Sequence, residues 1–164
     1  LTVTLGALLH DIADHKYHGG DKEIGPRTAR EWLNRIGVPS AVTEEVVEIV
    51  STISFSGPNG TKRMRTVAGS AVRDADRLDA IGAIGVARTF TYGGTKNRPL
   101  YDPAVPPSTV PGVMTTPSLN HFQEKLFRLK DLMETAAGAR IAAERHAFME
   151  EFVERFTLEC SGER

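Results

Sequence analysis

Near the middle of the chain, a helix-like stretch carries three acidic residues in an otherwise apolar, small-residue pattern. We expect one helix from Thr66 to about Tyr92, and it contains Asp74, Asp76 and Asp79. Burying a carboxylate is costly unless it is paired or binds a metal. Asp76 and Asp79 are three residues apart and share a helix face, whereas Asp74 points elsewhere. This pattern favours a helical fold that carries an ion-pair or metal site.

A second stretch, Leu5–Tyr17, ends an apolar run in the dipeptide His10-Asp11. A neighbouring imidazole nitrogen and carboxylate oxygen suit a divalent transition metal. We expect a helix from the start of the chain to about Asp14, which would place Asp14 on nearly the same face as Asp11 and within reach of a metal-bound water. Lys16 adds a positive charge that suits a phosphate. A lone His-Asp dipeptide is more often simply a helix end with solvated charges.

The remaining sequence is also mostly helical in pattern. Pro26 fits the first turn of a helix, and Gly37 fits its end. Apolar residues recur at helical spacing from Val42 to Ile53, and Ser40 offers N-cap chemistry in front of them. The loop 54–65 ends in Lys62-Arg63-Met64-Arg65, where phosphate binding and solvation are both open.

The C-terminal part is predicted to hold a long loop and two helices. The segment Lys96–Pro117 is rich in proline and lacks apolar periodicity, which indicates a surface loop. Helices are expected over Leu119–Glu134 and from Ala137 to about Thr157. The second is amphipathic, with an apolar face formed by Ile141, Phe148, Phe152 and Phe156.

Composition bounds the class of protein. The chain has 164 residues, of which 40% are hydrophobic and 25% charged, as expected for one globular domain. The formal net charge of -1 argues against a general nucleic-acid binder, and no run is long enough to span a membrane. The single cysteine, Cys160, cannot form an internal disulfide. A cytoplasmic location fits this cysteine usage.

Four segments together carry a family resemblance. They are H-D-I-A-D-H-K at His10–Lys16, I-S-F-S at Ile53–Ser56, the acidic helix segment Asp74–Phe90, and N-H-F-Q-E-K-L at Asn120–Leu126. The chain resembles the HD superfamily of metal-dependent phosphohydrolases, and within it the YpgQ/YedJ-like branch. The resemblance extends from Leu1 to about Phe156. It implies an all-α fold, a helical bundle of the HD-domain type, and a single HD domain over residues 1–164.

The family pattern H…HD…D implies a divalent metal bound by His10, Asp11 and Asp76. It also implies a further histidine ligand on an earlier helix. Only nine residues precede His10 and none of them is histidine. We therefore expect that the numbered chain lacks the N-terminal helices of the domain together with that first ligand.

The resemblance also implies roles for other residues. Asp14 and Lys16 are the expected catalytic residues, and Arg77, His121 and Lys125 are the expected substrate-binding residues. Structural ion pairing explains Lys16 and Arg77 equally well, and a salt bridge with Glu124 explains Lys125.

We expect one metal ion, Mn²⁺, with Mg²⁺, Co²⁺, Ni²⁺ or Fe²⁺ as alternatives. Related two-metal enzymes draw extra histidines from the interval between the HD pair and the final aspartate. Here that interval holds only His15 and His18. His146 lies far downstream and is expected to be a surface residue beside Arg145.

The implied activity is hydrolysis of a nucleoside triphosphate to a monophosphate and pyrophosphate. Nucleoside monophosphatase and cyclic phosphodiesterase activities remain alternatives. A nucleotide-sensing module with little turnover is the alternative from another class. The expected partner is a small-molecule nucleotide rather than a nucleic acid or a membrane, and a homodimer is compatible with the sequence.

Overall fold

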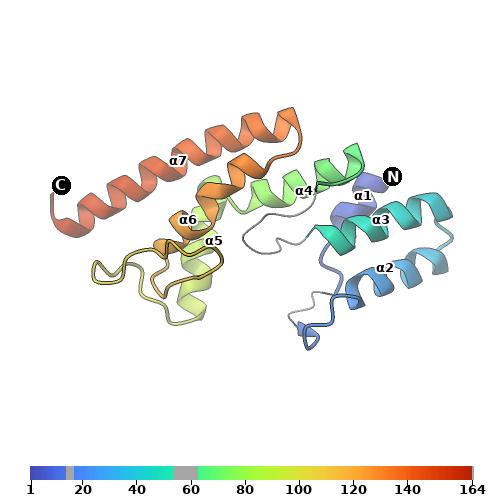
Figure 1. Cartoon of the computed structure of the whole chain (residues 1–164), viewed down its shortest axis with the longest axis horizontal. Helices are drawn as coiled ribbons and strands as arrows, with labels where there is room; N and C mark the ends of the chain where they lie inside the picture. The colour runs from blue at the N-terminus through green and yellow to red at the C-terminus, as the bar shows by residue number, and fades with distance from the viewer. Residues whose placement is uncertain (14–16, 54–62, 164) are drawn as a thin grey trace. The chain divides into compact units, whose positions relative to one another are not determined.

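The computed structural model describes residues 1–13, 17–53 and 63–163. Within these ranges the protein is helical and contains no β-strand, which confirms the all-α expectation. The chain divides into two compact units, Leu1–Asp74 and Ala75–Arg164, and it passes from one to the other inside helix α4 (Figure 1). That both units belong to one HD domain stays a prediction. None of the helices in the described ranges is long and apolar enough to cross a membrane.

The first unit contains α1 (Thr2–Leu9), α2 (Ile24–Arg35), α3 (Ser40–Thr52) and the first part of α4 (Val67–Asp79). Helix α3 packs against α1 and α2. The apolar positions that recur along α3 face inward, as predicted. The core of this unit is formed by Leu9, Ala29, Leu33, Val46, Val47 and Val50, with Ile49, Ile53 and Val72 in an adjacent cluster.

The boundaries of α2 agree with the sequence prediction. Pro26 lies in its first turn, where a missing backbone N–H does no harm. Gly37 follows its end with a φ of 76°, in the left-handed region that glycine adopts readily. The N–H of Val38 donates to Leu33 O at 3.1 Å, which completes a Schellman-type cap. The cap predicted at Ser40 is wrong, because Ser40 is the first residue of α3 and makes no side-chain cap bond.

Two exposed ion pairs tie α3 to its neighbours. Arg30 of α2 donates two hydrogen bonds to Glu44, at 3.1 and 2.8 Å, and these bonds lower the pKa of the Glu44 carboxyl. Arg65 donates to Glu48 at 2.7 Å. Arg65, at the basic end of the predicted loop, therefore forms an ion pair with a carboxylate of its own unit. Residues 54–62 lie outside the described ranges.

The helix predicted from Thr66 to about Tyr92 is two helices, α4 and α5 (Gly82–Thr95). The break falls at Ala80 and Ile81, and Gly82 then has a φ of 75°. The buried side chain of Ile81 joins the core of the second unit, so the chain turns there instead of continuing as a helix. The predicted end at about Tyr92 is also early, because α5 continues through Gly93 and Gly94 to Thr95.

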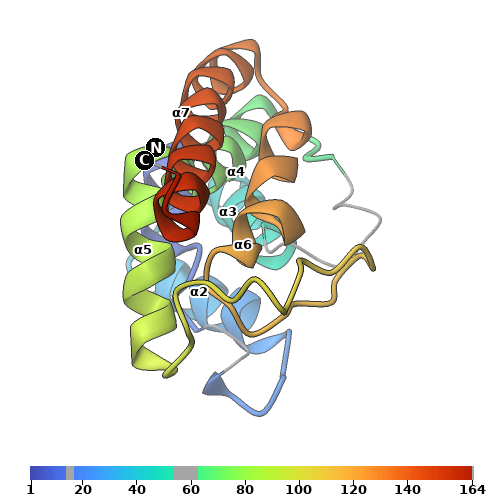
Figure 2. The ribbon, with the colours of Figure 1, turned by 90° about the vertical axis from the view of Figure 1, so that its left-hand side faces the viewer.

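The second unit continues with α6 (Asn120–Glu124), the 3₁₀ helix η2 (Leu126–Leu132) and α7 (Ala136–Ser161). The helix predicted over 119–134 is thus divided at Lys125, which has φ and ψ of -140° and -55°. Helix α7 packs against α5 and η2 (Figure 2). The core of this unit consists of Ile81, Leu119, Phe122, Leu126, Leu129, Ala142 and Met149.

Aromatic rings line the inner face of α7. Phe152 and Phe156 pack against Phe90 of α5, with ring centroids 5.9 and 5.6 Å away. Phe148 was predicted to share this apolar face, but its side chain is 45% exposed. His146 was predicted to lie at the surface and is instead buried, 3.1 Å from Glu150 and edge-on to the ring of Phe127.

The long loop predicted before α6 is confirmed, and two buried side chains of α6 hold it in place. One carboxylate oxygen of Glu124 accepts hydrogen bonds from Ser108 N at 2.9 Å, Thr115 N at 3.0 Å and Thr115 Oγ1 at 2.7 Å. Asn120 Nδ2 donates to Val105 O and to Thr115 Oγ1, both at 2.8 Å. Asn120 and Glu124 of the N-H-F-Q-E-K-L segment thus fix the preceding loop, a structural role that the sequence did not indicate.

Replacing Glu124 with alanine should lower the free energy of unfolding by about 3 kcal/mol or more, because buried backbone donors lose their acceptor. The loop should also become easier to cleave. Urea unfolding and limited proteolysis measure the two effects. Exposed Gln123, also on α6, is the matched control, and Gln123→Ala should change neither. Equal stability of the two variants would contradict the role given to Glu124.

Candidate metal centre

His10 and Asp11 lie in a turn directly after α1. The helix was predicted to run to about Asp14 but ends at Leu9, and the N–H of Ile12 donates to Leu9 O at 3.0 Å in a tighter turn. Asp11 therefore does not lie on a helix whose face it could share with Asp14. Asp14 itself lies outside the described residues, so its place near the pair stays a prediction.

The ring of His10 is oriented by the backbone of the helix it follows. Its Nδ1 lies 2.8 Å from Ala7 O. A carbonyl oxygen only accepts, so Nδ1 carries the proton and Nε2 of the neutral ring has a lone pair. Nε2 lies 3.3 Å from Asp11 Oδ2. His10 Nε2 and Asp11 Oδ2 can therefore either form an imidazolium–carboxylate ion pair or bind one cation together.

The donor set of this pair fits a divalent transition metal. Metal-binding histidines usually donate their other ring N–H to a carbonyl or carboxylate, as His10 does to Ala7. His10 is half-buried and Asp11 exposed, so a cation can reach them. In the part of the chain that the structure describes, no group of three or more His, Cys, Asp or Glu side chains is arranged to hold a metal.

The three acids of α4 have different environments. Asp74 is buried in the first unit, whereas Asp76, in the second unit, is exposed. Asp79 is exposed too and forms an ion pair with Arg88 of α5. Asp74 was expected to point away from the other two acids, and its burial agrees with that expectation. The free-energy cost of burying a carboxylate therefore applies to Asp74 and not to the predicted ligand Asp76.

Arg77 is buried and makes contacts within its own unit. Its Nη1 donates to Leu132 O at the end of η2 and lies 3.8 Å from Glu134 Oε1. These contacts are of the structural kind that the sequence left open beside phosphate binding, which stays a prediction for Arg77. Lys16 was left open in the same way, and it lies outside the described residues.

His121 and Lys125 lie one turn apart, in and just after α6. Burial of the ring is the main cause that lowers the pKa of His121 to about 4, and the charge of Lys125 is the second. Arg98 acts in the same direction and Glu124 opposes both. The imidazole is therefore neutral at pH 7. Its Nδ1 is buried and has no hydrogen-bond partner among the described residues.

The lowered pKa of His121 predicts a pH dependence of stability. His121 takes up a proton near pH 6.5 in the unfolded chain and only near pH 4 in the folded chain. The contribution of the neutral ring to the free energy of unfolding is therefore fully present above pH 6.5 and is lost as the pH falls toward 4. Between pH 7.5 and 4.5 the wild type should lose about 2 kcal/mol more unfolding free energy than His121→Gln. Urea unfolding at both pH values measures this, and an NMR titration of His121 with a midpoint near 6.5 would contradict it.

Solved structures and a sequence relative share this fold. YpgQ of Bacillus subtilis is 34% identical over an alignment of 168 positions, and the alignment covers 98% of this chain and 73% of YpgQ. An HD-superfamily hydrolase from Bacillus thuringiensis is 42% identical with a TM-score of 0.75, covering 98% of this chain and 73% of that one. B. subtilis YpgQ has also been crystallised with ADP; that structure aligns at 24% identity and a TM-score of 0.65, covering 96% and 87% of the two chains. No protein-family model matches the chain.

These similarities place the protein among helical hydrolases. The chain belongs to the HD superfamily, in the branch that contains YpgQ. The four sequence segments thus predicted the family correctly. The individual site residues remain predictions, and His10 and Asp11 are the two whose mutual geometry is described.

Proposed function

We propose that the protein is a metal-dependent phosphohydrolase that splits nucleoside triphosphates into monophosphates and pyrophosphate. The observation that carries the proposal is the His10–Asp11 pair, with Nδ1 of His10 held by a carbonyl and Nε2 directed at a carboxylate. Membership of the HD superfamily supports hydrolysis. The ADP complex of YpgQ supports a nucleotide as the ligand, and a cytoplasmic nucleotide pool would supply it.

His10, Asp11 and Asp76 would hold the metal. When bound, a divalent ion polarises the phosphoryl group and lowers the pKa of water. The chain supplies the remaining functions. Asp14 would orient the attacking water and accept its proton. Lys16 would neutralise charge on the phosphate.

In the second unit, Arg77, His121 and Lys125 are the proposed substrate-binding residues. His121 would act as a neutral hydrogen-bonding group, since its lowered pKa keeps it uncharged at pH 7. Lys125 and Arg77 would contribute positive charge to the binding of an anionic ligand. Arg77 also makes structural contacts with Leu132 and Glu134. Its role in binding phosphate is therefore tested separately, by measuring the KM for the nucleotide in an Arg77 variant.

The test is product analysis on a panel of nucleoside tri-, di-, mono- and cyclic phosphates with Mn²⁺ added. Release of pyrophosphate from triphosphates is expected. Release of inorganic phosphate from monophosphates would favour a monophosphatase, and turnover of cyclic nucleotides would favour a phosphodiesterase. Nucleotide binding without turnover would favour a sensing module. Each of these last three results contradicts the proposed reaction.

We expect one metal ion per chain. Two-metal sites hold their ions about 3.5–4 Å apart and need ligands beyond those of a single ion. Histidine is absent from Gly19 to Ala75, so only His15 and His18 lie between the HD pair and Asp76. Elemental analysis of the Mn²⁺-loaded protein should give a ratio of one or below. A ratio near two, or two adjacent anomalous peaks, would contradict the single-ion site.

A further inference from the structure

The last turn of α4 carries Asp76 and ends in carbonyl groups that the helix itself does not satisfy. The N–H of Ala80 donates to Arg77 O at 3.2 Å, and the N–H of Ile81 donates to Leu78 O at 3.3 Å. Arg145 of α7 adds a second donor to Leu78 O through its Nη1. This contact joins residues far apart in the sequence within the second unit.

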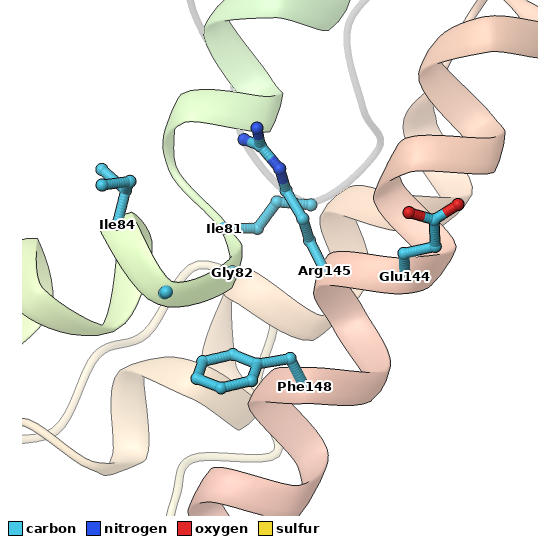
Figure 3. A pocket seen from close by; sticks show the side chains of 7 residues that line it. Ile81, Gly82, Ile84, Glu144, Arg145 and Phe148 are labelled. Atoms are coloured by element: carbon cyan, nitrogen blue, oxygen red, sulfur yellow. The ribbon is translucent and has the colours of Figure 1, made fainter.

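The side chain of Arg145 is fixed along its length as well as at its end. Its aliphatic stem occupies the space beside Gly82, where an added Cβ would lie 2.9 Å from Arg145 Cγ and 3.1 Å from Cδ. Figure 3 shows Arg145 passing beside Gly82 and reaching from α7 toward the end of α4. The same stem forms one wall of an open cleft of about 310 Å³. A glycine at the start of α5 thus makes room for the arginine that reaches back to α4.

The charge of Arg145 also suits this position. The C-terminal end of a helix carries a partial negative charge, and a guanidinium placed there is stabilising. Arg88 contacts the same helix end, but it does so from the exposed side through Asp79. Arg145 is the more enclosed of the two, and it contacts the carbonyl two residues after Asp76.

We propose that Arg145 is a positioning residue for Asp76. By holding Leu78 O, it fixes the last turn of α4 and so the direction of the Asp76 carboxylate. This inference rests on the proposed function, in which Asp76 is a metal ligand. Residues that orient metal ligands typically change metal affinity by about ten- to a hundredfold when they are removed.

The experiment compares Mn²⁺ affinity by calorimetric titration in three arginine variants. Arg145→Met keeps the stem beside Gly82 and loses the donor, so Mn²⁺ should bind at least about tenfold more weakly. Arg145→Lys keeps a charge and a donor and should stay within about threefold of wild type. Arg140 is the matched control, because it lies on α7, is exposed and pairs with Glu144. Arg140→Met should leave the affinity unchanged.

A double-mutant cycle tests whether Arg145 acts through Asp76. In an Asp76→Asn background the ligand is already impaired, so Arg145→Met should cause no further loss of Mn²⁺ affinity. An equal loss in both backgrounds would overturn the proposal, and so would unchanged affinity in Arg145→Met. If Asp76→Asn itself binds Mn²⁺ like wild type, the proposed metal site fails whatever Arg145 does.

Circular dichroism and thermal unfolding of each variant separate positioning from general stability. Arg145→Gln is a second variant that removes the contact, because its side chain is too short to reach from α7 to Leu78. Its Mn²⁺ affinity should equal that of Arg145→Met. A lowered unfolding temperature with normal Mn²⁺ affinity would make Arg145 purely structural. Loss of the fold in both variants would lead to the same conclusion and overturn the proposal.

Discussion

Replacing Asp76 with alanine should abolish metal binding. The change removes a carboxylate ligand, and its neighbours on α4 are poorly placed to substitute for it. Asp74, two residues earlier, points in another direction and is buried in the first unit. Asp79 shares the helix face, but its carboxylate forms an ion pair with Arg88. Elemental analysis of the purified variant, with Mn²⁺ supplied in excess, measures the effect.

Asp79→Ala is the matched control for this experiment. It removes an exposed carboxylate from the same helix and breaks an exposed ion pair, which contributes about 1 kcal/mol or less to stability. Its metal content should therefore equal that of wild type. Full occupancy in Asp76→Ala together with loss in Asp79→Ala would show that the ligand assignment is wrong.

Two helices of the first unit, α2 and α3, were predicted well from the sequence. The spacing from Val42 to Ile53 predicted α3, and Pro26 and Gly37 predicted the limits of α2. These signals are local, since periodicity and end residues lie within the helix that they describe. The errors arose where a distant side chain decides the backbone.

The break between α4 and α5 is one such place. Gly82 in a small-residue pattern is compatible with a continuous helix, whereas the turn buries Ile81 in the core of the second unit and places Gly82 against Arg145 of α7. The end of α1 is a different case, because the ring of His10 bonds to Ala7 O, only three residues back, beside a tight turn. No sequence spacing indicates either contact.

The individual site residues show the same limit of local signals. Residue types at motif spacing indicated His10 and Asp11, whose side chains lie 3.3 Å apart, and their role as metal ligands stays a prediction. The motif left phosphate binding and structural ion pairing open for Arg77, and it indicated Glu124 only as a salt-bridge partner of Lys125. Both prove to contact carbonyl or amide groups of segments far along the chain. A sequence supplies the chemistry of a side chain but not its partner.

The Asp14→Asn variant should keep its metal and lose most of its turnover, by about a hundredfold to ten-thousandfold. Asp14 lies outside the described residues, so the expectation rests on its position after the His-Asp pair in the HD motif. Asparagine retains the size of the side chain and one acceptor oxygen but cannot take a proton from water. Steady-state turnover of a nucleoside triphosphate with Mn²⁺, beside metal content, measures both effects.

Asp21→Asn is the control for the general effect of losing a carboxylate in this region. Asp21 accepts a hydrogen bond from Glu23 N at 3.0 Å and lies 3.5 Å from Arg27, so its contacts are those of a structural turn. Its variant should turn over at the wild-type rate. An unchanged rate in Asp14→Asn at normal metal content would remove Asp14 from the mechanism. Loss of the metal from that variant would instead make Asp14 a ligand, since removing a pure general base leaves the ion in place.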